Sequence, residues 1–252
     1  FSKERAIDSD SIRSLFEDSQ GRLWIGTNDI GVVMLQDDVF TQIESPADNS
    51  FACIRDFVET KDGNIYVASP SGMAQIVDSK VVPMSDERIQ GKGVFSIAID
   101  SYHRVWGCTE TGECIILKDG NLVELFPSET VFETARIYCI DSDEQGRIVV
   151  GTSANKAAII GFSSESLKRE DLYIEEFSTG DVSFHNVIES VGGFLMISGN
   201  NGLAIVAPDG VVKTFGEELL KGMYLKTLQM SHLKKSMNGP NLLKTLKTPL
   251  QK

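Results

Sequence analysis

The sequence predicts an all-β fold, a β-propeller built from four-stranded antiparallel blades, with five blades visible. Three observations predict it: a ten-residue segment occurs five times, a short apolar run precedes each copy, and a small residue follows two positions after one anchor residue in each copy. The anchors are Trp24, Tyr66, Trp106, Val149 and Met196, at spacings of 42, 40, 43 and 47 residues. A period of about 40–50 residues is typical of repeat folds.

The first strand of each blade is predicted by the apolar run. The five runs are 12–16, 54–58, 94–99, 137–140 and 184–188, long enough for a strand and too short for a helix. Four residues link each run to the next strand, starting with Asp, Thr or Ser and ending with Gly or, once, His103. These residue types favour a hairpin closed by a type I turn and a bulge.

The second strand carries the anchor. Two residues later, on the same strand face, stand Gly26, Ala68, Cys108, Gly151 and Ser198. A small residue beside a large one in every unit suits sheets that pack face to face at about 10 Å. We therefore expect Trp24, Tyr66 and Trp106 to occupy equivalent places in successive blades, with the small residues interlocking between adjacent sheets.

Two further strands complete each unit, one after a turn that usually contains Gly and one after a polar break such as Asp119-Gly120. Four strands in about 40 residues describe a propeller blade. The approximate blades are 12–40, 54–84, 94–126, 137–177 and 184–215. Phe1 precedes residue 12 by the same interval that separates Phe126 from residue 137, so residues 1–11 are expected to end a preceding blade of a larger propeller, with about six to eight blades.

Charge divides the chain in two. Residues 1–216, the predicted propeller, hold 17 basic and 34 acidic side chains, whereas residues 217–252 hold seven lysines and two acidic residues. The tail is predicted to be disordered or a loose amphipathic helix. The acidic propeller is a poor partner for DNA or RNA, because nucleic acids bind basic surfaces.

The first copy also resembles a known family, the two-component regulator propeller repeat. The residues that carry the resemblance are Ile12, Leu15, Phe16, Glu17, Asp18, Ser19, Gly21, Leu23, Trp24, Ile25, Gly26, Thr27 and Gly31. The later copies match less closely, and the fourth and fifth lack an aromatic anchor.

The resemblance implies a sensory propeller, usually extracytoplasmic (periplasmic or at the cell surface), placed before a transmembrane segment and an output module. That module is a histidine kinase or a diguanylate cyclase in such receptors, which could pair as homodimers. No kinase, cyclase or DNA-binding motif occurs in this sequence, so the output module and the transmembrane segment are expected outside it.

Catalytic and metal motifs are sparse. Cys53, Cys108, Cys114 and Cys139 form no C-x-x-C pair and fall in predicted strands, so buried thiols are expected, with a Cys108–Cys114 disulfide as the alternative. The acidic residues include no D-x-D-x-D-G run for calcium. We expect no metal, no cofactor and no catalytic residue.

One repeat position suggests a binding site at the rim of the central channel. The second residue of each first strand varies among the blades, and the five are Arg13, Arg55, Phe95, Tyr138 and His185. Guanidinium groups bind carboxylates or phosphates, and aromatic faces stack on sugars. The loops that open on the same side add Asn28, Asp29, Asn200 and Asn201. Together they predict a small anionic or saccharide-like ligand, although the five side chains could instead cover the seams between blades.

The resulting hypothesis is a non-enzymatic ligand-sensing domain of a bacterial signal-transduction receptor. Two alternatives belong to other classes of protein. An enzyme, such as a propeller lyase or glycosidase, would need His185 or a carboxylate of raised pKa beside Arg13 and Arg55. A protein-interaction scaffold would need an exposed apolar patch of several hundred Å².

Overall fold

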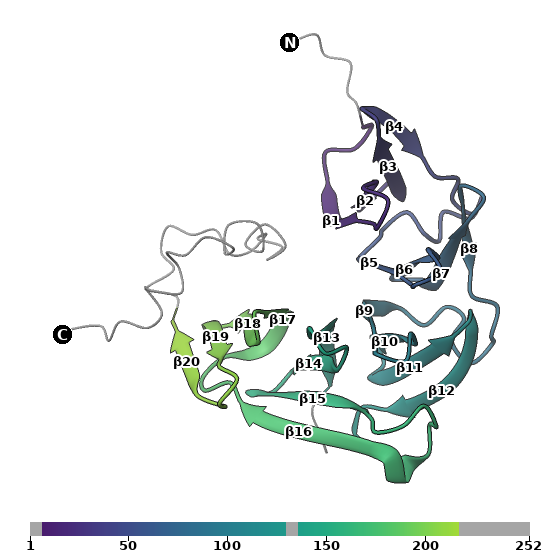
Figure 1. Cartoon of the computed structure of the whole chain (residues 1–252). Helices are drawn as coiled ribbons and strands as arrows, with labels where there is room; N and C mark the ends of the chain where they lie inside the picture. The colour runs from purple at the N-terminus through teal and green to yellow at the C-terminus, as the bar shows by residue number, and fades with distance from the viewer. Residues whose placement is uncertain (1–6, 130–135, 217–252) are drawn as a thin grey trace.

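The computed structural model of the protein describes residues 7–129 and 136–216. Within them the predicted fold class is confirmed: five four-stranded antiparallel sheets form the blades of a β-propeller. Figure 1 shows the blades arranged in an arc, with the first strand of each blade nearest the centre and the fourth strand outermost. Phe1 and the basic segment 217–252 lie outside the described residues, so the predictions made for them stay predictions.

Within each blade the strands follow one another in sequence order across the sheet. Blade 1 comprises β1 (Ile12–Glu17), β2 (Leu23–Thr27), β3 (Val32–Gln36) and β4 (Val39–Gln42). Blade 2 comprises β5 (Asp56–Glu59), β6 (Ile65–Ser69), β7 (Gly72–Val77) and β8 (Lys80–Pro83). Blade 3 comprises β9 (Val94–Ile99), β10 (Val105–Thr109), β11 (Glu113–Lys118) and β12 (Asn121–Pro127). Blade 4 comprises β13 (Ile137–Ser142), β14 (Ile148–Thr152), β15 (Lys156–Phe162) and β16 (Leu172–Ser178), with a short 3₁₀ turn, η1 (Arg169–Asp171), before β16. Blade 5 comprises β17 (Ser183–Val191), β18 (Phe194–Asn200), β19 (Gly202–Val206) and β20 (Val212–Phe215).

The hairpin that follows the first strand is held by one buried aspartate. In blade 1, Asp18 Oδ1 accepts hydrogen bonds from the backbone N–H groups of Gln20 and Arg22, each at 2.9 Å. Its Oδ2 accepts from Arg22 Nε at 2.6 Å and from the indole N–H of Trp24 at 2.8 Å. Burial alone would raise the pKa of Asp18, but the hydrogen bonds from Trp24 and Arg22 outweigh it and hold the pKa below its usual value. Asp18 thus connects the backbone of the turn to the side chain of the anchor Trp24 by hydrogen bonds.

The same network recurs with variations. In blade 3, Asp100 Oδ2 accepts from Arg104 Nε at 2.6 Å and from Trp106 Nε1 at 2.8 Å. In blade 4, Asp143 binds Arg147 in the same way, but the anchor there is a valine without an N–H group. The acidic residues at the turn starts of these blades are therefore structural, as the sequence indicated.

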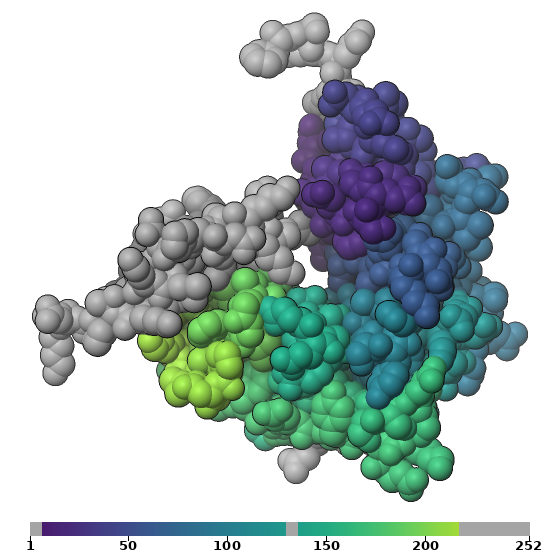
Figure 2. All heavy atoms as spheres, viewed as in Figure 1, coloured from purple at the N-terminus to yellow at the C-terminus, as the bar shows by residue number. Residues whose placement is uncertain are grey.

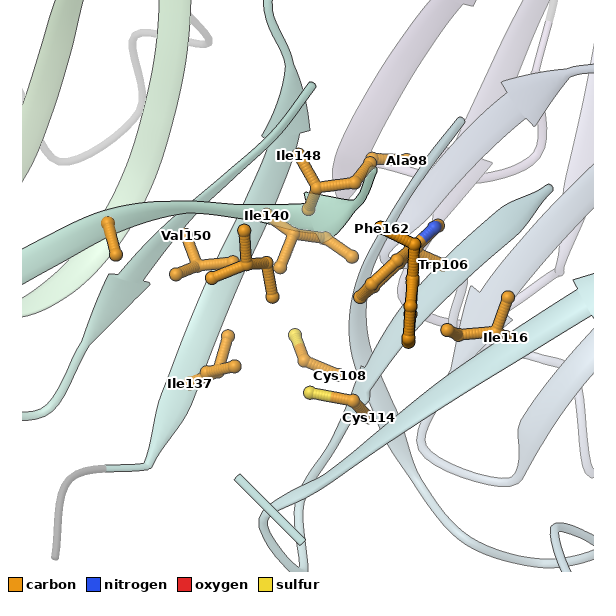
Figure 3. Close-up of a cluster of buried hydrophobic side chains, with 12 residues drawn as sticks. Ala98, Trp106, Cys108, Cys114, Ile116, Ile137, Ile140, Ile148, Val150 and Phe162 are labelled. Atoms are coloured by element: carbon orange, nitrogen blue, oxygen red, sulfur yellow. The ribbon is translucent and has the colours of Figure 1, made fainter. Parts of the chain in front are cut away.

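The hydrophobic core lies in the seams between blades. Each of the four seams holds its own cluster of buried side chains; Trp24 packs at the first seam, Tyr66 at the second and Trp106 at the third. The three anchors therefore occupy equivalent places, as predicted. Figure 3 shows the third seam, where Trp106 and Phe162 lie together with ring centroids 5.9 Å apart. In the space-filling view (Figure 2) each blade touches the next along the arc.

The small residue after the anchor explains how closely neighbouring sheets approach. A Cβ atom added to Gly26 would lie 2.9 Å from the carbonyl oxygen of Ile54 in the next blade and would also collide with Ser14 Oγ. At the matching position in blade 4, a Cβ on Gly151 would lie 2.7 Å from the Cβ of His185. These distances are far below van der Waals contact, so bulk at these positions separates the sheets.

Apart from the three-residue η1, the structure of residues 7–129 and 136–216 contains strands, turns and loops. No helix in this part of the chain has the length and apolar character needed to cross a membrane.

Candidate functional site

The innermost strands of blades 1, 3, 4 and 5 each contain a β-bulge near their first residue, and this bulge positions the variable side chain. In β1, Ile12 pairs with Thr27 and Ser14 pairs with Gly26, which leaves Arg13 as the extra residue. Phe95 and Tyr138 hold the same place in β9 and β13. In blade 2, Arg55 N–H donates to Ala68 O while Asp56 pairs with the same Ala68. A bulge turns its extra side chain away from the regular alternation of the strand, here at one mouth of the central channel.

Three of the five predicted side chains form one continuous row. Arg55 Cζ lies 5.2 Å from the ring centroid of Phe95, and the Phe95 ring stacks on Tyr138 at 5.1 Å and 30°. The row continues to Phe184, whose ring meets Tyr138 edge-on at 6.3 Å and 61°. We call Arg55, Phe95, Tyr138 and Phe184 the rim row. It crosses the seams between blades 2, 3, 4 and 5.

Arg55 is largely fixed by its neighbours. Its Nη1 donates to the carbonyl oxygen of Val94 at 3.1 Å, and its Nη2 pairs with Glu110 Oε1 at 2.5 Å. Its Nε is buried and has no hydrogen-bond acceptor among the described residues. Arg55 is 14% exposed at the side chain and Glu110 is 40% exposed, so the carboxylate is the more accessible partner. Glu110 therefore occupies a position that an anionic ligand group could take.

His185 does not lie on the rim, contrary to the sequence-based expectation. The side chain is completely buried. The backbone N–H of Thr152 donates to its Nδ1 at 2.8 Å, so Nε2 carries the proton and donates to the carbonyl oxygen of Val182 at 3.1 Å. Burial lowers the pKa of His185, which keeps the ring neutral. The histidine holds the seam between blades 4 and 5, and Phe184, half-exposed with φ 47°, takes the rim position instead.

The shift from His185 to Phe184 has a structural cause. In β17, Ser183 pairs with Asn200 and the next pair is Val187 with Ser198, so the bulge here is longer than in the other blades. The wider spacing of the last two anchors, 47 residues, comes from the long connection between β15 and β16 in blade 4 and gave no sign of this bulge. Alignment by the apolar run alone therefore placed the wrong side chain on the rim.

Arg13 takes the bulge position in blade 1 and is exposed. The nearby loop is braced by its own polar groups: Asn28 Nδ2 donates to Ser11 Oγ at 2.7 Å, and Asp29 Oδ1 accepts from Ser9 Oγ at 2.5 Å. These residues flank the mouth on the side of blade 1.

The blade 5 loop flanks the mouth at the other end of the arc. Asn200 ends β18, and Asn201 donates to the carbonyl oxygen of Asp181 at 3.2 Å. The predicted loop residues of blades 1 and 5 thus lie on the same face as the rim row, and Asn28, Asp29 and Asn201 are hydrogen-bonded within their own loops.

The cysteines are free thiols. Cys108 and Cys114 face each other across β10 and β11, and their side chains lie near one another in Figure 3. Burial raises the pKa of Cys108 to about 12, so the thiol stays protonated at neutral pH. Within residues 7–129 and 136–216, no group of three or more His, Cys, Asp or Glu side chains could hold a metal ion.

Comparisons with known proteins agree with this architecture. Residues 6–29 match the sequence model of the family described as Two component regulator propeller. No curated protein matches the chain.

Several solved structures share the fold. The extracellular domain of the putative hybrid two component system BT3049 from B. thetaiotaomicron has a TM-score of 0.66 and 24% identity, over 83% of this chain and 29% of that one. The corresponding domain of BT4673 has a TM-score of 0.65 and 16% identity, over 83% of this chain and 28% of that one. Virginiamycin B lyase from Staphylococcus aureus has a TM-score of 0.65 and 15% identity, over 81% of this chain and 69% of that one. At these identities the likeness establishes the propeller fold.

Proposed function

We propose that this two component regulator propeller is a non-enzymatic ligand-sensing domain of a bacterial signal-transduction receptor, acting outside the cytoplasm. The observation that carries the proposal is the rim row, in which one guanidinium and three aromatic rings from four blades contact one another in succession. The matched family repeat and the two extracellular sensor domains of similar fold support it. The output module, the transmembrane segment and any homodimer contact belong to the full-length receptor in this proposal.

The proposed ligand is a small anionic or saccharide-like molecule. Phe95, Tyr138 and Phe184 offer ring faces and edges of the kind on which sugars and flat rings stack. Arg55 offers a guanidinium that binds carboxylate, sulfate or phosphate groups. Because Glu110 already pairs with Arg55, an anionic ligand group must displace Glu110. Neutralising Glu110 should therefore strengthen the binding of anionic ligands.

The position of the row suggests how binding would be transmitted. The four side chains belong to four different blades, so a ligand that contacts several of them senses the relative placement of those blades. A ligand shifts a conformational equilibrium only by binding one arrangement more tightly than another. We infer that the ligand favours one packing of the seams and thereby changes how the propeller contacts the rest of the receptor.

A thermal-shift screen of sugars, sugar acids, organic acids and phosphates tests the proposal. We expect at least one compound to raise the Tm of the native protein, a smaller shift in Arg55→Ala and in Phe95→Ala, and a larger shift for anionic compounds in Glu110→Gln. Arg13→Ala, alone and with Arg55→Ala, reports whether blade 1 contributes. Arg88→Ala is the matched control, because Arg88 is 61% exposed and pairs with Asp86 in a loop. A screen without any stabilising compound, or equal shifts in native protein and Arg55→Ala, would contradict the proposed site.

The lyase of similar fold makes an enzyme the second candidate. Two side chains bear on it. His185, the candidate acid or base, is buried and uses both ring nitrogens within the seam. Asp56 has its pKa raised to about 6 by burial, but it accepts hydrogen bonds from Ser96 Oγ and Ile97 N–H. These roles favour sensing. Mass spectrometry of each stabilising compound after incubation with the protein distinguishes the two, since an enzyme would consume it.

A protein-interaction scaffold would use an exposed apolar surface. The exposed apolar side chains of the outer strands belong to different blades, among them Val39, Val82, Val123 and Ile174. This distribution favours the ligand-sensing proposal over a scaffold.

A further inference from the structure

Blade 2 departs from its neighbours at the hairpin turn on the face opposite the rim row. In blades 1 and 3 an aspartate at the turn start accepts hydrogen bonds from an arginine and from the tryptophan anchor. Blade 2 has Thr60, Asn64 and Tyr66 at these three positions. Thr60 Oγ1 accepts only the backbone N–H of Asn64, at 3.2 Å. The charged network that fills the turn in blades 1 and 3 is therefore missing from blade 2.

A pocket stands where that network would be. Its volume is about 290 Å³, and its walls come from the turns at 60–64 of blade 2 and at 101–103 and 118–120 of blade 3, with Glu165 of blade 4 at the margin. The Tyr66 side chain is 3% exposed and lines this pocket. Its hydroxyl group makes no hydrogen bond to a described residue, whereas the indole N–H groups of Trp24 and Trp106 each have an aspartate acceptor. The hydroxyl group faces the pocket and can donate a hydrogen bond there to water or to a ligand.

The other seams are bridged at this level. Ser19 of blade 1 donates from its N–H and its hydroxyl to Glu59 of blade 2, each at 2.7 Å. Ser101 N–H of blade 3 donates to Gly146 O of blade 4 at 2.7 Å, and Ser190 Oγ of blade 5 donates to Glu144 of blade 4 at 2.8 Å. Among the described residues, no hydrogen bond joins the blade 2 turn at 60–64 to the blade 3 turn at 101–103. The pocket thus replaces a bridge between two blades.

The charges around the pocket have both signs. Lys118 pairs with Glu165 and closes one side. Lys61, Asp62 and Asp119 also line the pocket, and none of the three forms an ion pair with another described residue. Burial, together with the negative charge of Asp119, raises the pKa of Tyr66, so the phenol remains a hydrogen-bond donor at neutral pH. A purely anionic ligand would be repelled by Asp62 and Asp119, and a purely cationic ligand would be repelled by Lys61.

We propose that this pocket binds a small zwitterion, a free amino acid or a dipeptide, between blades 2 and 3. The carboxylate of the ligand accepts hydrogen bonds from Lys61 Nζ and the Tyr66 hydroxyl, and its ammonium group is held by Asp62 and Asp119. Asn64, whose side-chain oxygen already accepts from Gln75 at 3.0 Å, retains its amide N–H groups for the ligand. Such a molecule would supply the contact between the two turns that the other seams make for themselves.

Isothermal titration calorimetry with glycine, L-glutamine and glycylglycine tests the proposal on the native chain. We expect at least one of them to bind with a Kd below about 1 mM. Tyr66→Phe and Lys61→Gln should each weaken that binding about tenfold or more, because each removes a hydrogen bond to a charged group. Tyr173→Phe and Lys80→Gln are matched controls, since Tyr173 lies on β16 and Lys80 on β8, both outside the pocket lining; neither should change Kd.

Three results would overturn the proposal. The first is the absence of binding by all three zwitterions to native protein. The second is equal binding to Lys61→Gln, an exposed position at which folding is not at risk even if Tyr66→Phe proves unstable. The third is tighter binding of glucose or glycerol than of any zwitterion, which would assign the pocket to neutral polyols. The pocket and the rim row lie at opposite ends of the strands, so failure here leaves the proposed sensing function untouched, and the reverse also holds.

Discussion

Replacing Asp100 with asparagine tests the role of the buried aspartate in the blade 3 turn. The asparagine oxygen can still accept from the backbone N–H groups of Tyr102 and Arg104, which now bind Asp100 Oδ1 at 2.9 and 3.0 Å. The amide group that replaces Oδ2 is a donor, and it would face two donors, Arg104 Nε and Trp106 Nε1. The substitution therefore keeps the size of the side chain and removes only the acceptor.

The expected loss of stability follows from burial. The side chains of Arg104 and Asp100 are 1% and 5% exposed, so the variant leaves an uncompensated guanidinium and an unpaired indole N–H in the interior. Breaking a buried ion pair by removing one partner costs about 3–5 kcal/mol. Asp143→Asn is the matched control: Arg147 is 37% exposed and the anchor is a valine, so a loss of about 1 kcal/mol or less is expected there.

Urea unfolding at neutral pH, followed by far-ultraviolet circular dichroism, measures both variants. Circular dichroism reports all blades, whereas the fluorescence of Trp24 and Trp106 would report blades 1 and 3 and would not report the blade 4 turn of the control variant. Blades of a repeat protein need not unfold together, so the comparison uses the first transition of each variant. Equal losses in the two variants, or a loss below about 1 kcal/mol in Asp100→Asn, would refute the assignment of the stabilisation to buried Oδ2.

Three further variants follow from the seams and the buried titratable groups. Gly26→Ala should lower the free energy of unfolding in urea by about 1–3 kcal/mol, because the new Cβ would lie 2.9 Å from the carbonyl oxygen of Ile54. Gly216→Ala is the control and should be neutral, because no described atom lies within 4 Å of the Cβ it would add. Equal losses of stability in the two variants would contradict the interlocking of the sheets at the seams. Burial raises the pKa of Asp56 to about 6, so the folded state binds the proton of this carboxyl more tightly than the unfolded chain does. The free energy of unfolding should therefore fall by about 2–3 kcal/mol as pH rises from 4 to 6. Asp56→Asn should lose this pH dependence, and a variant with the same pH dependence as native protein would refute the assignment. Burial lowers the pKa of His185, so stability should be lost as pH falls through 6.5, when the unfolded chain takes up a proton that the folded ring refuses; His185→Gln should show a flatter profile than native protein over that range.

The fold could be predicted from the sequence because each blade repeats a local chemical pattern. Turn residues, the anchor and the small residue after it are read from one short segment, and the structure places Trp24, Tyr66 and Trp106 equivalently. The binding role expected for the rim residues stays a prediction, and the structure shows only that three of them are neighbours. Arg55, Phe95 and Tyr138 meet because the first strands of three blades begin with the same bulge.

The other features of the two candidate sites could not be predicted from the sequence. The pairing of Arg55 with Glu110 joins two blades, and no local pattern indicates it. His185 was misplaced because the extra residues of the β17 bulge leave the apolar run unchanged. The substitutions at Thr60, Asn64 and Tyr66 are visible in the sequence, but their meaning depends on the aspartate network of the neighbouring blades, which only the structure reveals.

The repeated bulge divides the residues of the blades into two groups that are constrained by different neighbours. Residues that hold the seams are constrained by the sheet on either side, whereas the bulge residue belongs to no ladder pair and is constrained by its side-chain neighbours. Arg13, Arg55, Phe95, Tyr138 and Phe184 hold this place, one residue per blade, so exchanging residues between blades at this place would change the chemistry of one face of the propeller while leaving the ladder pairs of the sheets unchanged.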